Sequence, residues 1–316
     1  MAEPWYLYAG FIAFVIAMLL IDLKVGHAEE HEATTKEAAA WATFWVGLGV
    51  AFGVIVYFWR GSETAAEYYA GFLIEKALSV DNMFVFVLIF SYFKIPLKYQ
   101  HQVLFYGILG AMIFRGIFIA LGVALINNFE WIIYIFGAFL VYTAIKIARG
   151  TEEVHPEENP ILQFAQRRIR TTTKLDGQKL FTVENGRRLA TPLLIVLLFI
   201  EITDIVFAID SIPAIFAITR DPFIILTSNV FAILGLRALY FLLAGFIERF
   251  HLLKYGLAVI LGFVGIKMLL LYWHVEVPIL WSLTFIIAVL AVTVILSLKL
   301  PPPDDIPHGD ELLPDA

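Results

Sequence analysis

The sequence contains no cysteine and little charge, and both absences limit what the protein can do. Without cysteine there are no disulfides, no thiolate metal ligands and no thiol chemistry, so a metal site must use oxygen or imidazole ligands. Only 16% of the 316 residues are charged and 60% are hydrophobic, whereas soluble domains have about 25% and 45–50%. The mean hydropathy of +0.83 shows the same excess. Many of these apolar side chains must face lipid, which excludes a water-soluble enzyme.

Basic excess and nucleotide-binding signatures are missing as well. The formal net charge is −6, so the chain has no basic footprint for nucleic acid. No glycine-rich phosphate loop occurs, which argues against an NTPase-driven pump. We therefore expect no enzymatic activity and no required cofactor, and the first expected partner is the lipid bilayer.

Long apolar runs, by contrast, are abundant. A membrane helix needs about 20 mostly apolar residues. Nine stretches qualify: 5–23, 41–59, 67–93, 103–126, 130–148, 192–219, 223–248, 254–273 and 279–298. The sequence thus predicts an all-α polytopic membrane protein with a transmembrane domain over 1–298 and a disordered acidic tail over 299–316.

Positive charges fall almost entirely on one side of these predicted spans. When the connections alternate across the bilayer, fifteen Lys and Arg residues lie on one side and only two, Arg60 and Arg220, on the other. The positive-inside rule then places the N-terminus outside, and the C-terminus and the 149–191 loop in the cytoplasm. The basic run Arg167–Arg170 in that loop fits a solvated loop and also fits contact with anionic lipid.

The chain also repeats itself. Leu73–Asn82 matches Ile202–Ser211, because each has an acid, five further residues, and then an aspartate with a small polar neighbour. Each copy comprises three spans, 67–148 (spans 3–5) and 192–273 (spans 6–8). Three is an odd number, so we predict that the two copies are inverted in the membrane. Inverted repeats are an architecture of secondary transporters, which bind substrate at the repeat interface.

Further matched charges extend the repeat. The second span of each copy carries one arginine and the third ends in a lysine; the residues are Arg115 with Lys146, and Arg237 with Lys267. We predict that these cations are counter-charges, which either pair with acids when a metal leaves or only brace the helices.

Five carboxylates lie well inside the predicted spans: Glu75, Asp81, Glu201, Asp204 and Asp210. Each charge costs about 2.5–3.5 kcal/mol at a helix centre, so such residues rarely persist without a partner or a task. Structural ion pairs that only orient helices are one interpretation. Proton transfer is a second task that mid-membrane carboxylates can perform.

The neighbours of these acids favour metal binding. Asn82 and Ser211 follow two of the aspartates and complete an all-oxygen set, which hard divalent cations such as Mn²⁺, Mg²⁺ or Ca²⁺ prefer. The acids of each copy are six residues apart, so both reach one site only if the helix bends or unwinds between them. Pro213 favours such a break in the second copy. Weaker candidates are Asp22, Thr203, Asn229 and the run His27–Glu32.

Two long motifs resemble a known family. Glu75–Phe86 (EKALSVDNMFVF) and Glu201–Ala214 (EITDIVFAIDSIPA) are similar to the signatures of the TerC family, including its Alx-type proteins. The resemblance covers all nine predicted spans. It implies a bacterial inner-membrane protein of metal-ion homeostasis, with manganese export in the Alx-like branch and tellurium resistance in the name-giving branch. The metal residues carried over by motif are Glu75, Asp81, Asn82, Glu201, Asp204, Asp210 and Ser211.

The favoured hypothesis is an exporter of Mn²⁺ or a similar divalent cation that works by alternating access. A non-transporting scaffold that docks partners through the 149–191 loop is the alternative, and a homo-oligomer stays open. An intramembrane aspartyl protease would need Asp81 and Asp210 as its pair, but neither lies in a Gly-x-Gly-Asp motif.

Overall fold

Helices dominate the computed structural model, which describes residues 4–26, 35–149, 171–172, 174–184, 186–243 and 250–300. Three regions considered above lie outside the described residues: the histidine-containing run 27–32, the basic run 167–170 and the tail from 301 onward. The helices are α1 (Trp5–Gly26), α2 (Thr35–Arg60), α3 (Ser62–Tyr92), α4 (Leu97–Asn128), α5 (Ile132–Ala148), α7 (Pro192–Phe216), α8 (Pro222–Ile233), α9 (Leu236–Leu243), α10 (Leu253–Leu270), the short η3 (Leu271–Trp273) and α11 (Ile279–Lys299).

The multi-pass membrane character predicted from composition is confirmed. Seven helical segments are long and apolar enough to cross a membrane: Trp5–Asp22, Lys36–Arg60, Leu97–Asn128, Pro192–Phe216, Pro222–Leu243, Leu253–Trp273 and Ile279–Lys299. Two predicted spans differ from these. α3 has 31 residues but carries several charges, and α5 is apolar but only 17 residues long. The protein is therefore an all-α polytopic membrane protein.

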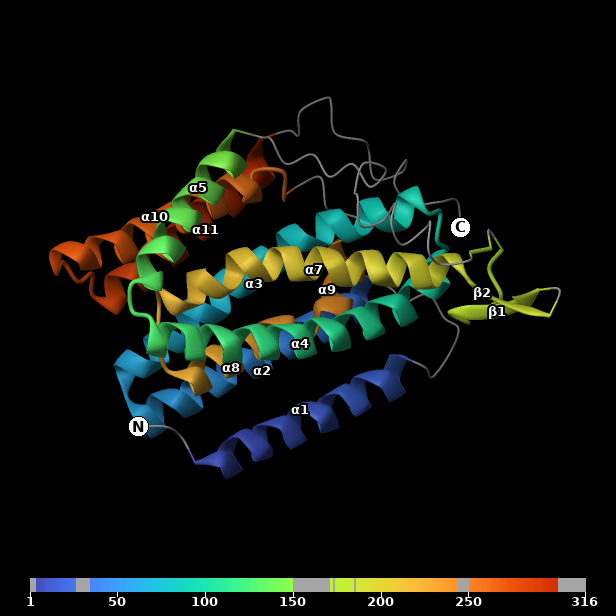
Figure 1. The fold of residues 1–316 in the computed structure, drawn as a ribbon, viewed down its shortest axis with the longest axis horizontal. Coiled ribbons are helices and arrows are strands. Elements are labelled where there is room, and N and C mark those ends of the chain that lie inside the picture. The colour runs from blue at the N-terminus through green and yellow to red at the C-terminus, as the bar shows by residue number, and fades with distance from the viewer. Residues whose placement is uncertain are drawn as a thin grey trace.

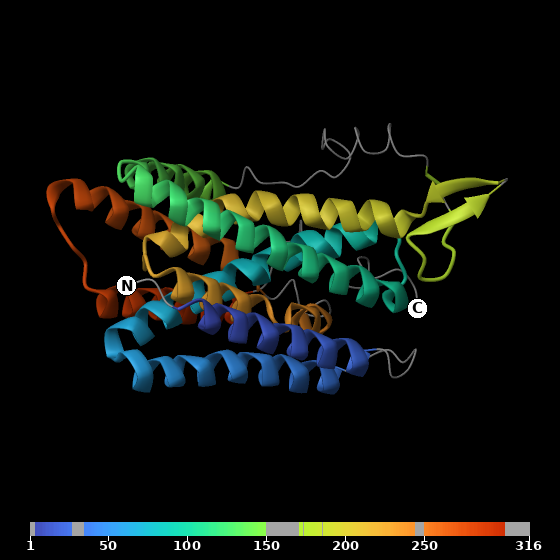
Figure 2. The same ribbon diagram turned by 60° about the horizontal axis from the view of Figure 1, so that its bottom comes forward.

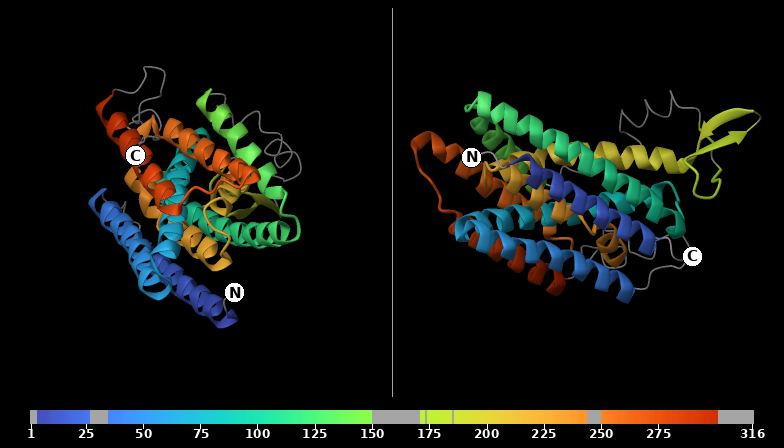
Figure 3. Two further views of the ribbon diagram at one scale, coloured as in Figure 1. Left: turned by 90° about the vertical axis from the view of Figure 1, so that its left-hand side faces the viewer. Right: turned by 90° about the horizontal axis from the view of Figure 1, so that it is seen from below.

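Helix α3 lies at the centre of the bundle and contacts α2, α7, α8, α10 and α11. Seen end-on, α1 and α2 lie at one side and α5 at the opposite side (Figure 3). α1 and α11 leave large apolar side chains exposed along their lengths, whereas 78% of the most apolar window of Pro222–Leu243 is buried. Lipid thus covers the outer helices, and the α8–α9 segment belongs to the interior.

The two predicted copies pack in a reciprocal way. α3 packs on α8 as α7 packs on α4, and α5 packs along α10. α3 and α7 run in opposite directions (Figure 1). Gly137 of α5 and Gly265 of α10 let the two backbones approach closely, because a Cβ at Gly265 would lie 2.7 Å from the carbonyl oxygen of Gly137. This packing is what an inverted repeat requires, and the inversion itself stays a prediction.

The helix breaks predicted between the paired acids of α3 and α7 are absent, and the structure has a break elsewhere. α3 and α7 are each continuous, and α7 runs through Pro213 to Phe216, so neither unwinds between its paired acids. The interruption lies instead in the seventh predicted span, between α8 and α9, where Gly235 has φ +81°. A proline near a helix end removes one hydrogen bond, and the packing around α7 is sufficient to keep its helix intact.

The 149–191 loop contains a β-hairpin that the sequence analysis did not predict. β1 (Phe181–Glu184) pairs antiparallel with β2 (Arg187–Ala190), and Gly186 takes a positive φ of 73° at the turn. Figure 2 shows the hairpin extending beyond the end of α7. The end of α1, the α3–α4 turn and the hairpin all lie at one end of the bundle (Figure 1). Three connections that the charge distribution assigns to one side of the membrane thus lie at the same end, and the orientation itself stays a prediction.

Candidate functional site

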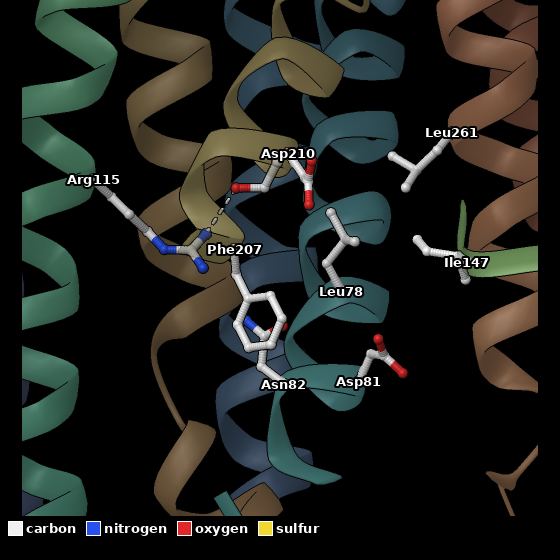
Figure 4. Close-up of a pocket in the computed structure, with 9 residues that line it drawn as sticks. Leu78, Asp81, Asn82, Arg115, Ile147, Phe207, Asp210 and Leu261 are labelled. Atoms are coloured by element: carbon white, nitrogen blue, oxygen red, sulfur yellow. Dashed lines mark hydrogen bonds between the residues drawn. The ribbon is translucent and has the colours of Figure 1, made fainter. Parts of the chain in front are cut away.

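The two signature helices meet at a small cavity. It has a volume of about 20 Å³, enough for one water-sized occupant. Polar residues from both copies line it, namely Asp81 and Asn82 of α3, and Asp210 and Ser211 of α7. Figure 4 shows Asp210 at one side of this space and Asp81 and Asn82 further along α3, with Arg115 reaching in from α4. Four of the seven predicted metal residues thus line one cavity.

Arg115 holds the first acid of each copy. Its guanidinium forms an ion pair with Glu75 and a two-pronged contact with Asp204, from Nη2 to Oδ1 at 3.0 Å and from Nε to Oδ2 at 3.2 Å. Nη1 also approaches Ser211 Oγ at 3.4 Å. The side chains of Arg115 and Glu75 are 2% and 1% exposed. Such a buried, bidentate arginine contact is both strong and geometrically specific. Arg115 is therefore the electrostatic link between the two copies.

The second acid of copy two has a partner that the sequence analysis missed. Thr143 of α5 donates a hydrogen bond from Oγ1 to Asp210 Oδ1 at 3.1 Å. Thr143 is the first residue of the matched stretch that ends in Lys146, so the repeat could have indicated it as a polar candidate. Val264 stands at the matching position in copy two and cannot donate. The hydrogen bond therefore fixes the orientation of one carboxylate at the cavity.

Asn229 is brought to the site as a donor. Its Nδ2 donates to Glu75 Oε2 at 3.1 Å, while its own Oδ1 is buried without a hydrogen-bond partner in the described chain. Glu75 therefore receives Arg115 on one oxygen and Asn229 on the other. Asn229 is one of the weaker sequence candidates; the structure places its amide beside Glu75, and its role in a metal site stays a prediction.

Glu201 lies apart from the cavity. Its carboxylate packs against Gly110 of α4, where a Cβ would overlap it. Oε2 is buried with no hydrogen-bond partner, and no cation of the described residues forms an ion pair with Glu201. Glu201 therefore does not line the cavity, although it lies near Asp204 on the same helix.

The remaining candidates are also outside the cavity. Thr203 donates to the carbonyl of Phe199 in its own helix at 2.7 Å, so its hydroxyl is already engaged. Asp22 forms an ion pair with Arg237 at 3.0 Å. Lys146 is exposed on α5, and Lys267 is partly buried on α10. Neither lysine lines the cavity.

Four of the five carboxylates, all except Glu201, form two groups of two rather than one cluster. Among the described residues, no three His, Asp or Glu side chains are close enough together to hold one metal ion. Glu75 and Asp204 are bound to Arg115, whereas Asp81 and Asp210 line the cavity. The site offers carboxylate, amide and hydroxyl oxygens, which suit a hard cation. A guanidinium stands at its edge.

Comparisons with known proteins identify the family of the chain. Residues 60–302 match the family described as integral membrane protein TerC family. An "Uncharacterized membrane protein STKORF319" from Myxococcus xanthus is 52% identical over 293 residues, covering 92% of each chain. The "Putative membrane-bound redox modulator Alx" of Escherichia coli is 47% identical over 302 residues, covering 92% of this chain and 94% of that one.

The name of a less similar relative gives no function. The "Uncharacterized membrane protein" of Rickettsia bellii is 44% identical over 288 residues, covering 91% of this chain and 95% of the relative. No solved structure matches significantly. Because the family match spans most of the chain and these relatives are matched over nearly their full lengths, the chain belongs to the TerC family of integral membrane proteins.

Proposed function

We propose that the protein exports a divalent metal cation, Mn²⁺ by preference, from the cytoplasm across the bacterial inner membrane. The single observation that carries this proposal is the cavity where the Asp-Asn pair of one copy and the Asp-Ser pair of the other meet. A space of this size with carboxylate, amide and hydroxyl oxygens from both copies in its wall suits a hard, largely dehydrated cation. The positive-inside rule puts the N-terminus outside and the 149–191 loop in the cytoplasm.

Arg115 supplies the counter-charge in this proposal. The single positive charge of Arg115 is shared between Glu75 and Asp204, so it offsets part of the negative charge that these two buried acids carry. When a metal ion arrives at Asp81 and Asp210, its two positive charges repel Arg115. Release of Glu75 and Asp204 would then add two carboxylates to the coordination shell. Metal and arginine thus compete for the same acids.

Alternating access follows from the reciprocal packing of the copies. α3 and α7 each pack on the second helix of the other copy, and the cavity lies between them. Rocking of one copy against the other would open the cavity to either side, as in transporters built from inverted repeats. Protons entering through mid-membrane carboxylates are the proposed counter-flow.

The test is Mn²⁺ flux in proteoliposomes containing a Mn²⁺-quenched dye. The parent should move Mn²⁺ faster in an imposed pH gradient, and the double variant Asp81→Asn/Asp210→Asn should lose at least about tenfold of this flux, since both charged ligands are gone. Glu130→Gln is the matched control, because Glu130 is an exposed acid in the α4–α5 turn.

Equal flux in the parent and the double variant would contradict the proposal. Absence of flux in the parent with Mn²⁺, Ca²⁺ and Zn²⁺ would favour the scaffold alternative, in which the 149–191 loop docks a partner. Deletion of the hairpin residues 181–190 would then abolish the cellular phenotype, and the aspartate variants would retain it.

A further inference from the structure

The break between α8 and α9 is occupied by a lysine from another helix. Leu234 leaves helical geometry with φ −56° and ψ 131°, and Gly235 follows with φ +81°. Lys76 of α3 reaches this point, and its Nζ donates to the carbonyl oxygens of Ala232 at 2.9 Å and Leu234 at 3.5 Å. An ammonium group thus sits where the helix stops.

Such a position attracts cations for a physical reason. The C-terminal end of a helix carries the negative end of its dipole, and its last carbonyls lack helical partners. Where membrane helices are interrupted, freed carbonyls and half-helix C-terminal ends coordinate monovalent cations in transporters. The carbonyls of Ala232 and Leu234 have this chemistry, and Lys76 provides the positive charge.

The lysine is not there to neutralise a carboxylate. No acid among the described residues forms an ion pair with Lys76, although Glu75 precedes it in the chain. Glu75 instead receives Arg115 and Asn229. The contacts of Lys76 are with backbone oxygens, which is the coordination that an alkali cation would have.

The two copies differ both in the lysine and in the helix break that it fills. Ile205 stands in copy two where copy one has Lys76. The helix that corresponds to the broken α8–α9 segment is α4, which is continuous from Leu97 to Asn128. The lysine and the interruption that it fills therefore each occur in one copy only, within the part of the chain that the structure describes.

The break is also sealed from water. Ala232 and Leu234 are 0% and 1% exposed. Trp45 packs against Gly235, where a Cβ would overlap the indole, and the tryptophan is itself fully buried. Carbonyl oxygens in such surroundings need a charge or donor, because water is not available to them.

We propose that the α8–α9 break is a binding site for a small monovalent cation and that the ammonium of Lys76 is its built-in occupant. The carbonyls of Ala232 and Leu234 are its ligands. The parent protein therefore needs no Na⁺ or K⁺ at this position. Shortening Lys76 empties the site and opens it to an alkali cation from solution.

The experiment measures thermal unfolding of purified Lys76→Ser in detergent, with NaCl, KCl or choline chloride at equal ionic strength. In choline the Tm of the variant should fall below that of the parent. NaCl or KCl should raise it again, by an increment that grows with the logarithm of the cation concentration, as expected for ligand binding to the folded state. The Tm of the parent should not depend on which cation is present.

Two variants control for other causes. Lys76→Met removes the charge but fills the space, so its Tm should fall and should not recover with any cation. Lys267→Ser removes a lysine from α10, where Glu67 is the charged neighbour, and should show no difference among Na⁺, K⁺ and choline. Equal Tm values of Lys76→Ser in all three salts would overturn the proposal.

A folding failure still gives an answer. If Lys76→Ser cannot be purified in choline, the yield of monodisperse protein purified throughout in NaCl, KCl or choline replaces Tm. Recovery in an alkali salt alone supports the site, and equal failure in all three salts refutes it. A second measurement, of Mn²⁺ flux, rests on the proposed function. The flux of Lys76→Ser should depend on Na⁺ or K⁺, and the flux of the parent should not. The stability result does not depend on transport, so the two failures can be distinguished.

Discussion

The two arginines at matched positions of the repeat have different partners. Arg115 in the continuous helix α4 is buried between α3 and α7 and binds an acid from each copy. Arg237 in the short helix α9 binds Asp22 of α1 through the carboxylate at 3.0 Å and the backbone carbonyl at 2.7 Å. One arginine joins the two copies, and the other joins copy two to a helix outside the repeat.

Helix continuity offers a reason for this difference. In a regular helix each residue turns by about 100°, so an unbroken α4 carries Arg115 to a fixed face. In copy two the helix is interrupted at Gly235, two residues before Arg237, so the direction in which Arg237 points no longer follows from the turn of the preceding helix. Matched sequence positions therefore give matched partners only where the backbone between them is also matched.

The largest expected effect comes from Arg115→Gln. It leaves Glu75 and Asp204 buried beside each other without their cation, which costs about 3–5 kcal/mol. Arg237→Gln breaks a pair whose side chains are 10% and 16% exposed, and should cost about 1–3 kcal/mol. Thermal unfolding in detergent shows which of the two variants loses more stability.

A double variant sharpens this comparison. Glu75→Gln added to Arg115→Gln should recover part of the lost stability, because it removes one of the unpaired charges. If Arg237→Gln destabilises the protein as much as Arg115→Gln does, the two arginines are equivalent and the comparison fails.

The close crossing of α5 and α10 gives the next effect. Gly265→Ala places a Cβ 2.7 Å from a backbone oxygen of Gly137, so the matched third helices must separate, at a cost of about 1–3 kcal/mol. Gly262→Ala is the control on the same helix, since its Cβ would meet only Ala144 at an ordinary 3.5 Å. A lower Tm for Gly265→Ala alone is expected. Equal Tm values would mean that this contact does not hold the copies together.

The smallest effect is expected at the cavity wall. Thr143→Val gives copy one the residue that copy two has at Val264, and it removes the hydrogen bond to Asp210. Because Asp210 is only half-buried, loss of this hydrogen bond should cost about 0.5–1.5 kcal/mol. Thr203→Val is the control, because that hydroxyl bonds only to its own helix. Unfolding measurements that show no difference between these variants would remove Thr143 from the site.

The sequence was a good guide to which residues carry chemistry, and a poorer one to their grouping. The repeat identified the acids, the matched arginines and the polar neighbours at the cavity. It treated the seven predicted metal residues as a single set, whereas the structure divides them among the cavity, Arg115 and Gly110. That division depends on which helices are neighbours, and residue spacing along one chain does not contain this information.

The same limit applies to the helix breaks. Pro213 is a local signal, but α7 stays helical because packing outweighs one lost hydrogen bond. Gly235 was not singled out, since an isolated glycine in an apolar run has little meaning until a neighbour such as Trp45 packs on it.

Composition and charge determined that this chain is a helical membrane protein, because lipid tolerates long apolar helices and the distribution of basic residues is visible in the sequence. Repetition of two motifs determined where its buried acids lie. Only the tertiary structure decided that Arg115 links the copies while Arg237 does not, and that Lys76 fills the broken helix. Partners of buried charges are chosen by distances between helices, and those distances exist only once the helices are packed.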